Sequence, residues 1–294
     1  MAIVGHSSRP AAGAAQSIGG TAARLLREGT RGQVAAVFSA SVYLSTNYPA
    51  RYLCLLSGKA PDGPLHVRVD WTAAHMTRQF QTGQSWHVAN SVLHCGRVQL
   101  ALQYALPWSP EPIEHLATSQ YGGTALHVGW HRWRKLHQRS AALGAVVNGT
   151  GPWPAFAKQA TDSLRNWLSD KAHADAAFAA VRALAGLGTG LTPAGDDLLG
   201  GLALMLRAQS SSKLAPLCDS VMPCLHRTHP ISAAHLGEAL HGRASAPALD
   251  ALRGVLRRDD AAVEAACTQL GHTSGWDMLA GMLLAVTAGL ETGR

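Results

Sequence analysis

Three prolines within residues 107–112, in the stretch Leu106-Pro-Trp-Ser-Pro-Glu-Pro112, separate two halves of different character. Prolines at this density continue neither a helix nor a strand. Short alternating segments precede them, and an Ala- and Leu-rich helical pattern follows. We therefore predict an α+β chain with three parts: an N-terminal segment 1–30 that is partly flexible, a β-rich domain 31–110, and a mainly α-helical C-terminal domain 111–294.

The first half predicts a small antiparallel β domain, either a barrel or a sandwich. Its segments are short, and turn signals such as Lys59-Ala-Pro-Asp-Gly-Pro64 separate them. One short helix is expected earlier, at Thr21–Glu28. The expected strands are Val34–Leu44, Tyr52–Leu56, Leu65–Val69, His87–Leu93 and Val98–Tyr104.

The second half predicts a bundle of helices, because it is poor in β-branched residues. Its longest apolar runs, around Leu198–Leu206 and Met278–Leu290, are shorter than the ~20 residues that span a bilayer. We interpret them as buried core helices of a cytoplasmic protein without a membrane role. The expected helices are Gly129–Val147, Pro154–Leu168, Ala172–Leu187, Pro193–Ala208, Lys213–Leu225, Ala233–Leu240, Ala246–Arg257, Ala261–Leu270 and Gly275–Leu290.

Charge and cysteine content exclude some classes of function. The net charge of +7 favours anionic partners without choosing among them. Five cysteines without a Cys-x-x-Cys indicate reduced thiols rather than a disulfide framework or a zinc knuckle. The basic, aromatic stretch Trp130–Arg139 is best interpreted as an amphipathic helix, with Trp130, Trp133 and Leu136 inward, so no nucleic acid is expected. For the histidines between two helices we expect capping and surface roles, with Ser232 as a helix cap; they are His226, His229, His235 and His241.

A glycine-rich turn before the helix that starts near Pro193 is the strongest functional signal. Gly188-Thr189-Gly190 leaves main-chain N–H groups uncovered, and a helix N-terminus follows, with Thr192 as the expected cap. This combination binds phosphate or carboxylate. The carboxylates of Asp196 and Asp197 would repel an anion unless a proton or a divalent cation intervenes, so this pair is a candidate Mg²⁺ site. No other cofactor is expected. The alternative is a tight turn whose Asp residues cap backbone groups.

The same pattern recurs about eighty residues later. Gly195-Asp-Asp197 is followed by Gly201, and Gly275-Trp-Asp277 is followed by Gly281. Gly inside a helix costs roughly 1 kcal/mol relative to Ala, so these positions indicate a close approach. We predict that the two helices pack as a pseudo-symmetric pair, with Asp197 and Asp277 facing one cleft.

These patterns define one candidate site on the two helix N-termini. His272, Thr273 and Ser274 could bind substrate or transfer a proton. The candidate catalytic residues are Asp196, Asp197, His272 and Asp277. The candidate substrate-binding residues are Gly188, Thr189, Gly190, Thr192, Gly195, Thr273, Ser274 and Gly275.

The two motifs resemble the signatures of the AllH family, some of whose members are subunits of an oxamate carbamoyltransferase. The resemblance covers the C-terminal half, and the N-terminal half agrees only in its β-rich layout. The resemblance implies a carbamoyl-transfer reaction in allantoin or purine catabolism, in which oxalurate and phosphate are exchanged with oxamate and carbamoyl phosphate. It also implies that three kinds of subunit share this reaction and that one of them is FdrA-like. The residues carried over are Gly186, Gly188, Gly190, Leu191, Thr192, Pro193, Gly195, Asp196 and Asp197, then Gly271, His272, Thr273, Ser274, Gly275 and Asp277.

Two other functions stay open at the level of sequence. The loop could cradle the phosphates of a magnesium nucleotide in a phosphotransfer enzyme that acts alone, although no Walker Gly-Lys-Ser/Thr and no nearby lysine accompany it. The chain could also be a non-catalytic assembly or regulatory subunit whose motif shapes an interface.

Overall fold

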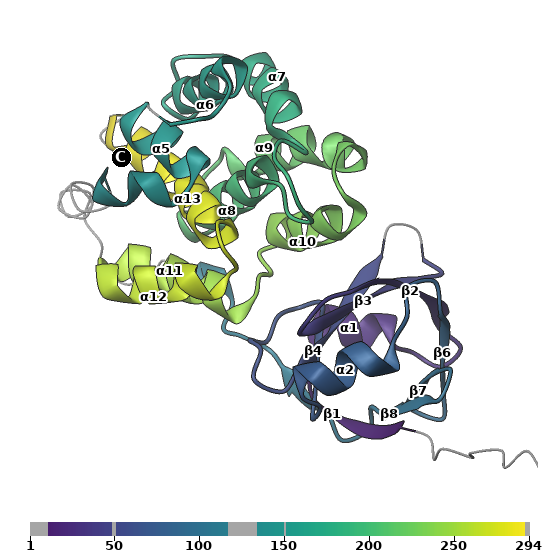
Figure 1. Cartoon of the computed structure of the whole chain (residues 1–294). Coiled ribbons are helices and arrows are strands. Elements are labelled where there is room, and N and C mark those ends of the chain that lie inside the picture. Colours follow the sequence, from purple (N-terminus) through teal and green to yellow (C-terminus); the bar gives the residue numbers. More distant parts are fainter. Residues whose placement is uncertain (1–10, 49–50, 117–133, 150, 292–294) are drawn as a thin grey trace, which may run out of the picture. The chain divides into compact units, whose positions relative to one another are not determined.

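Figure 1 shows the computed structural model, which describes residues 11–48, 51–116, 134–149 and 151–291. The chain divides into two compact units, Met1–Ser109 and Pro110–Arg294. The boundary falls among the prolines that separate the two sequence patterns.

The first unit is an eight-stranded β-barrel with one extra strand, as the sequence predicted in outline. Its strand order is β5-β4-β3-β2-β6-β7-β8-β1; β1 pairs with β5 to close the barrel, and β9 adds to β1. Two short helices, α1 (Gly20–Leu25) and α2 (Ala73–Gln79), belong to this unit. The strands are β1 (Ala11–Gly19), β2 (Arg31–Val37), β3 (Ser41–Thr46), β4 (Tyr52–Ser57), β5 (His66–Val69), β6 (Ser85–Ala89), β7 (Val92–Cys95), β8 (Val98–Ala101) and β9 (Leu106–Trp108).

The barrel is not purely antiparallel. Strand β1 runs parallel to β8 and β9, and β4 runs parallel to β5. Alternation along β3 buries Val42 and Leu44 completely, which is the period-2 pattern that the sequence showed. Two of the expected strands, Val34–Leu44 and His87–Leu93, prove to be hairpins; the second turns at Asn90 and Ser91, both with positive φ.

The second unit is helical. Its elements surround a central pair, α8 and α13, which lie side by side in Figure 1. The expected inward residues Trp130 and Trp133 lie outside the described residues. The elements are α3 (Ile113–Leu116), η2 (Arg134–Arg139), α5 (Ala141–Asn148), α6 (Ala155–Leu168), α7 (Ala174–Leu184), α8 (Ala194–Ala208), α9 (Leu214–Val221), η3 (Met222–Arg227), α10 (Pro230–Leu240), α11 (Ala246–Arg257), α12 (Asp260–Gln269) and α13 (Ser274–Glu291).

Glycines bring the backbones of α8 and α13 into direct contact. A Cβ added at Gly201 would lie 1.9 Å from the carbonyl oxygen of Met278, and one at Gly281 would lie 1.9 Å from that of Leu198. The contact is reciprocal, so it relates the two helices as a pseudo-symmetric pair. The predicted packing of these two helices is confirmed.

The pseudo-symmetry extends to the preceding helices. A Cβ at Gly195 would lie 2.0 Å from the carbonyl oxygen of Leu184 at the end of α7. A Cβ at Gly275 would lie 2.2 Å from the carbonyl oxygen of Cys267 near the end of α12. Each central helix therefore begins against the C-terminal turn of the helix before it. In the described part of the chain, no helix is long and apolar enough to cross a membrane.

Candidate functional site

Asp197 and Asp277 occupy the first turns of α8 and α13, where the glycine contacts hold these helices together. Both are buried: Asp197 is 9% exposed and Asp277 is 2% exposed. In the described part of the chain, Oδ2 of Asp197 and Oδ1 of Asp277 are buried without a hydrogen-bond partner. Burying a carboxyl oxygen without a hydrogen-bond partner costs free energy, so each of these atoms lacks a polar partner that would stabilise it.

Hydroxyl groups occupy the other positions around these carboxyls. Ser274 and Thr192 hydrogen-bond to Asp197. Their own oxygens, Thr192 Oγ1 and Ser274 Oγ, lie 2.9 Å apart. This hydrogen bond joins the two sequence motifs directly and lies beside the buried carboxyl of Asp197. Both hydroxyl residues are half-exposed, whereas Asp197 itself is buried.

Burial controls the protonation of the two carboxyls. It raises the pKa of Asp197 well above its usual range, and the charges of Asp277 and Asp196 raise that pKa further. Burial also raises the pKa of Asp277, to about 6, against hydrogen bonds from Ser140, Thr273 and the backbone of Ala142 that lower it. Burial therefore favours the protonated form of both carboxyls, and that of Asp197 more strongly than that of Asp277.

Asp196 has a different role from its neighbour. Its Oδ1 accepts the N–H of Gly186 at 2.8 Å, and its Oδ2 accepts the hydroxyls of Ser232, at 2.6 Å, and Thr228. These bonds tie the glycine loop and α10 to α8, as the capping alternative predicted. Both Asp196 oxygens are engaged, so the Asp196–Asp197 pair does not fit a shared Mg²⁺. Among the described residues, no group of three His, Cys, Asp or Glu side chains could hold a metal. Magnesium stays an untested prediction.

The glycine loop presents main-chain donors to solvent. Gly188, Thr189 and Gly190 are exposed, with φ of +126° at Gly188 and +90° at Gly190. A Cβ at Gly188 would lie 2.7 Å from the nitrogen of Ala194, so the turn needs glycine there. The N–H groups of residues 188–192 donate to no acceptor in the described part of the chain. Such a run of free donors beside a helix N-terminus suits an anion.

The second loop has the same character. Gly271, His272 and Thr273 are exposed, while Gly275 is buried against α12. The N–H groups of residues 271–275 likewise have no acceptor among the described residues. The His272 side chain has no hydrogen bond or ion pair with the described residues, so its predicted catalytic role stays a prediction.

Sequence reasoning missed two polar residues of this region and misplaced two caps. Ser140 was missed although its Oγ caps α5, accepting the N–H of Leu143 at 3.0 Å, and it also hydrogen-bonds to Asp277. Thr228 was not singled out, and Ser232 was expected to cap α10. The N-cap of α10 is His229, whose Nδ1 accepts the N–H of Ile231 at 3.2 Å. Similarly, the N-cap of α8 is Pro193, so the hydroxyl of Thr192 is free to bond across to the second motif.

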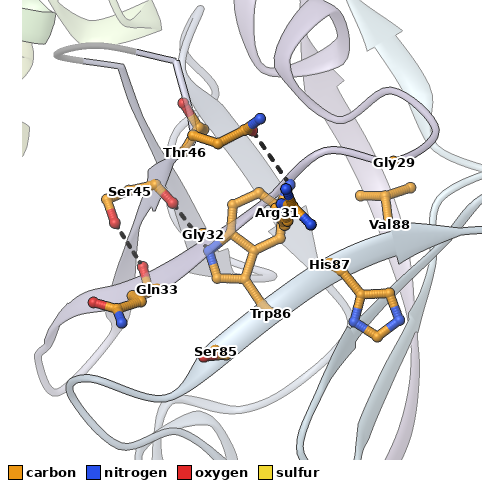
Figure 2. A pocket seen from close by; sticks show the side chains of 11 residues that line it. Gly29, Arg31, Gly32, Gln33, Ser45, Thr46, Ser85, Trp86, His87 and Val88 are labelled. Atoms are coloured by element: carbon orange, nitrogen blue, oxygen red, sulfur yellow. Dashed lines mark hydrogen bonds between the residues drawn. The ribbon is translucent and has the colours of Figure 1, made fainter.

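Figure 2 shows a separate open pocket of about 750 Å³ in the barrel. Its floor includes Trp86, whose Nε1 donates to the carbonyl oxygen of Ser45 at 3.1 Å. Arg31 and His87 line it, and no acidic residue does. None of the sequence-predicted site residues lies there. It contains no buried polar atom without a partner, whereas the carboxyl pair between α8 and α13 contains two.

Comparison with protein families places the same region in a known group. The model of the family described as oxamate carbamoyltransferase subunit AllH matches residues 184–286. No curated protein and no solved structure matches the chain in such comparisons. The matched segment runs from the end of α7 to within α13, so it contains both loops, both buried carboxyls and the reciprocal glycine contact. The family model thus covers part of the chain, and the resemblance first seen in the two motifs is confirmed for residues 184–286.

Proposed function

We propose that this chain is a subunit of an oxamate carbamoyltransferase-like enzyme and that its helical unit contributes the site for a small anionic substrate. The observation that carries this proposal is the hydrogen bond between Thr192 and Ser274, because it brings two family motifs together beside Asp197 and Asp277. Sequence spacing of 82 residues separates these hydroxyls, so their meeting is a property of the fold.

The two glycine loops suit the anionic part of such a substrate. Their free N–H groups lie at the N-termini of α8 and α13, whose dipoles favour negative charge. A carboxylate of oxamate or oxalurate and the phosphate of carbamoyl phosphate are both of this class. The net charge of +7 attracts either ligand.

The carboxyl pair suits the proton transfer that carbamoyl transfer requires. The amide nitrogen of oxamate attacks the carbamoyl carbon of carbamoyl phosphate, a C–N bond forms, and the C–O bond breaks as phosphate leaves with its electron pair. The nitrogen must lose a proton in this step, and we assign it to the ionised carboxylate of Asp277. The protonated Asp197 donates a hydrogen bond to the reacting amide, and exposed His272 would pass the proton on to solvent.

The family description of a subunit implies partners, which we propose include an FdrA-like chain. We assign the enzyme to allantoin or purine catabolism on the same basis. Five cysteines without a disulfide among the described residues support a reducing, cytoplasmic location.

The test is reconstitution of the full chain with its partner subunits and measurement of phosphate released from carbamoyl phosphate and oxamate. Asp277→Asn is expected to lower kcat by about 10²-fold or more, because the amide cannot accept the proton from the attacking nitrogen. Asp250→Asn, in an exposed ion pair with Arg253, is the matched control and is expected to leave kcat unchanged. Full activity of Asp277→Asn with unchanged helix content would contradict the proposal.

A non-catalytic subunit is the second candidate, and one observation favours it. The two partnerless oxygens of Asp197 and Asp277 are buried, and the Thr192–Ser274 hydrogen bond holds the two loops together beside them. If the loops stay closed, the motif only joins two helices. Reconstituted activity that depends on the chain's presence but not on Asp277 would identify this role.

A further inference from the structure

The carboxyl pair between α8 and α13 has unmet hydrogen-bonding capacity in the described part of the chain. Asp197 and Asp277 each have one oxygen that no hydrogen bond reaches, and both side chains are at least nine-tenths buried. The glycine contacts hold α8 and α13 backbone to backbone at the residues that directly follow these two carboxyls. The charge of Asp277 adds to burial in raising the pKa of Asp197, which favours a proton on that carboxyl. A pair in which one carboxyl keeps its proton presents one O–H and one carboxylate oxygen.

We propose that Asp197 and Asp277 recognise the primary amide or ureido end of the substrate, –C(=O)NH₂, and so fix which end of the ligand enters the site. This inference rests on the proposed function. The O–H of Asp197 donates to the ligand's carbonyl oxygen, and the carboxylate of Asp277 accepts one of its N–H groups. Both partnerless oxygens then have a partner, which they lack in the empty site.

Charge determines where the opposite, anionic end of the ligand binds. A carboxylate or phosphate placed against Asp277 would meet a like charge in a site shielded from water. The free N–H groups of residues 188–192 and 271–274 belong to exposed or half-exposed residues at the same helix N-termini and have no acceptor among the described residues. The anionic end of the ligand therefore stays at the loops, and the neutral amide passes inward between Thr192 and Ser274.

Other ligand groups fit the pair less well. A guanidinium or an amine offers only donors, so it requires both carboxyls to be ionised, which burial opposes. A second carboxylate offers only acceptors and repels Asp277. The amide is the neutral group that supplies an adjacent donor and acceptor, which matches the pair one to one.

The test compares two probes of similar size on the full chain by calorimetry at pH 7. Oxamate has one amide and one carboxylate, whereas oxalate has two carboxylates. Oxamate is expected to bind at least about tenfold more tightly than oxalate, the scale of one lost charged hydrogen bond. Asp277→Ala is expected to reduce this preference to about threefold or less. Asp197→Asn, which keeps a donor beside the Asp277 carboxylate, is expected to keep the preference. Asp250→Asn is the surface control, and circular dichroism reports whether each variant folds.

Three results would overturn the proposal: equal affinity for the two probes, a preference that survives Asp277→Ala, or binding of neither probe. The outcome is separable from that of the proposed function. If the chain prefers oxamate but supports no carbamoyl transfer after reconstitution, the amide site is supported and the proposed reaction is wrong. A chain that supports transfer with no preference for oxamate retains the reaction and loses the amide site. If Asp277→Ala does not fold, Asp277→Asn replaces it, because the amide also removes the negative charge.

Discussion

Replacing Asp277 by Asn should change how the stability of the helical unit depends on pH. The folded pKa of Asp277 is about 6 against a usual value of 3.8. Because the folded state holds the proton more tightly, the stabilisation is complete below pH 3.8 and is lost as pH rises towards 6. The shift of about two units corresponds to about 3 kcal/mol, most of it lost between pH 4 and 7. Asn does not titrate, so the variant lacks this loss, and Asp197 without a charged neighbour loses less as well.

The measurement is the free energy of unfolding of both proteins from urea titrations, followed by circular dichroism at 222 nm between pH 4 and 7.5. The difference between wild type and variant removes the titration of all other groups. That difference should move by about 2–3 kcal/mol in favour of the variant as pH rises. Parallel curves for the two proteins would refute the raised pKa of the buried Asp277 carboxyl. Asp250→Asn, whose carboxylate is 59% exposed, should run parallel to wild type.

Four further substitutions, one of them a control, test the architecture around the pair. Gly201→Ala should destabilise the helical unit by roughly 3 kcal/mol, because its Cβ would lie 1.9 Å from a backbone oxygen. The control Gly237→Ala in α10 would place its Cβ near no atom within 4 Å and should stabilise the unit by up to about 1 kcal/mol. Urea titration compares the free energies of unfolding of the two variants. Ser232→Ala removes a 2.6 Å hydrogen bond to Asp196 and should cost about 1–2 kcal/mol, and a neutral result would show that this bond is not important. Gly188→Ala should weaken phosphate binding at least tenfold in calorimetry without lowering the melting temperature by more than a few degrees, because the strain lies in an exposed loop; unchanged binding would exclude the loop as the anion site.

The packing of the two helices could be predicted from the sequence because the same glycine spacing occurs in both. Gly195 and Gly275 each begin a helix, and a second glycine follows six residues later in both, at a cost that only a close approach explains. Neighbouring residues in a helix point about 100° apart, and spacing alone does not tell which side faces which partner. The sequence therefore treated Asp196 and Asp197 as one acidic pair, whereas the fold turns Asp196 towards Ser232 on α10 and Asp197 towards α13.

The barrel was predicted less completely, for physical reasons that differ from strand to strand. Strand β1 is rich in Ala and Gly, which have low strand propensity, and its pairing with β5 and β8 depends on barrel closure rather than on its own sequence. The turn between β6 and β7 has no glycine, so Asn90 and Ser91 did not mark it in the sequence. Parallel pairs such as β4–β5 cannot be read from alternation, which is the same for both directions.

The glycine contact between α8 and α13 has a consequence for how this protein tolerates change. Because Gly201 meets the backbone of Met278, and Gly281 that of Leu198, the spacing of the two helices is determined by main-chain atoms and not by side-chain volume. Leu202, Leu279 and other buried residues of these helices can therefore exchange for similar apolar residues without moving Asp197 relative to Asp277. Substitutions in the surrounding core should therefore leave the distance between the two carboxyls unchanged.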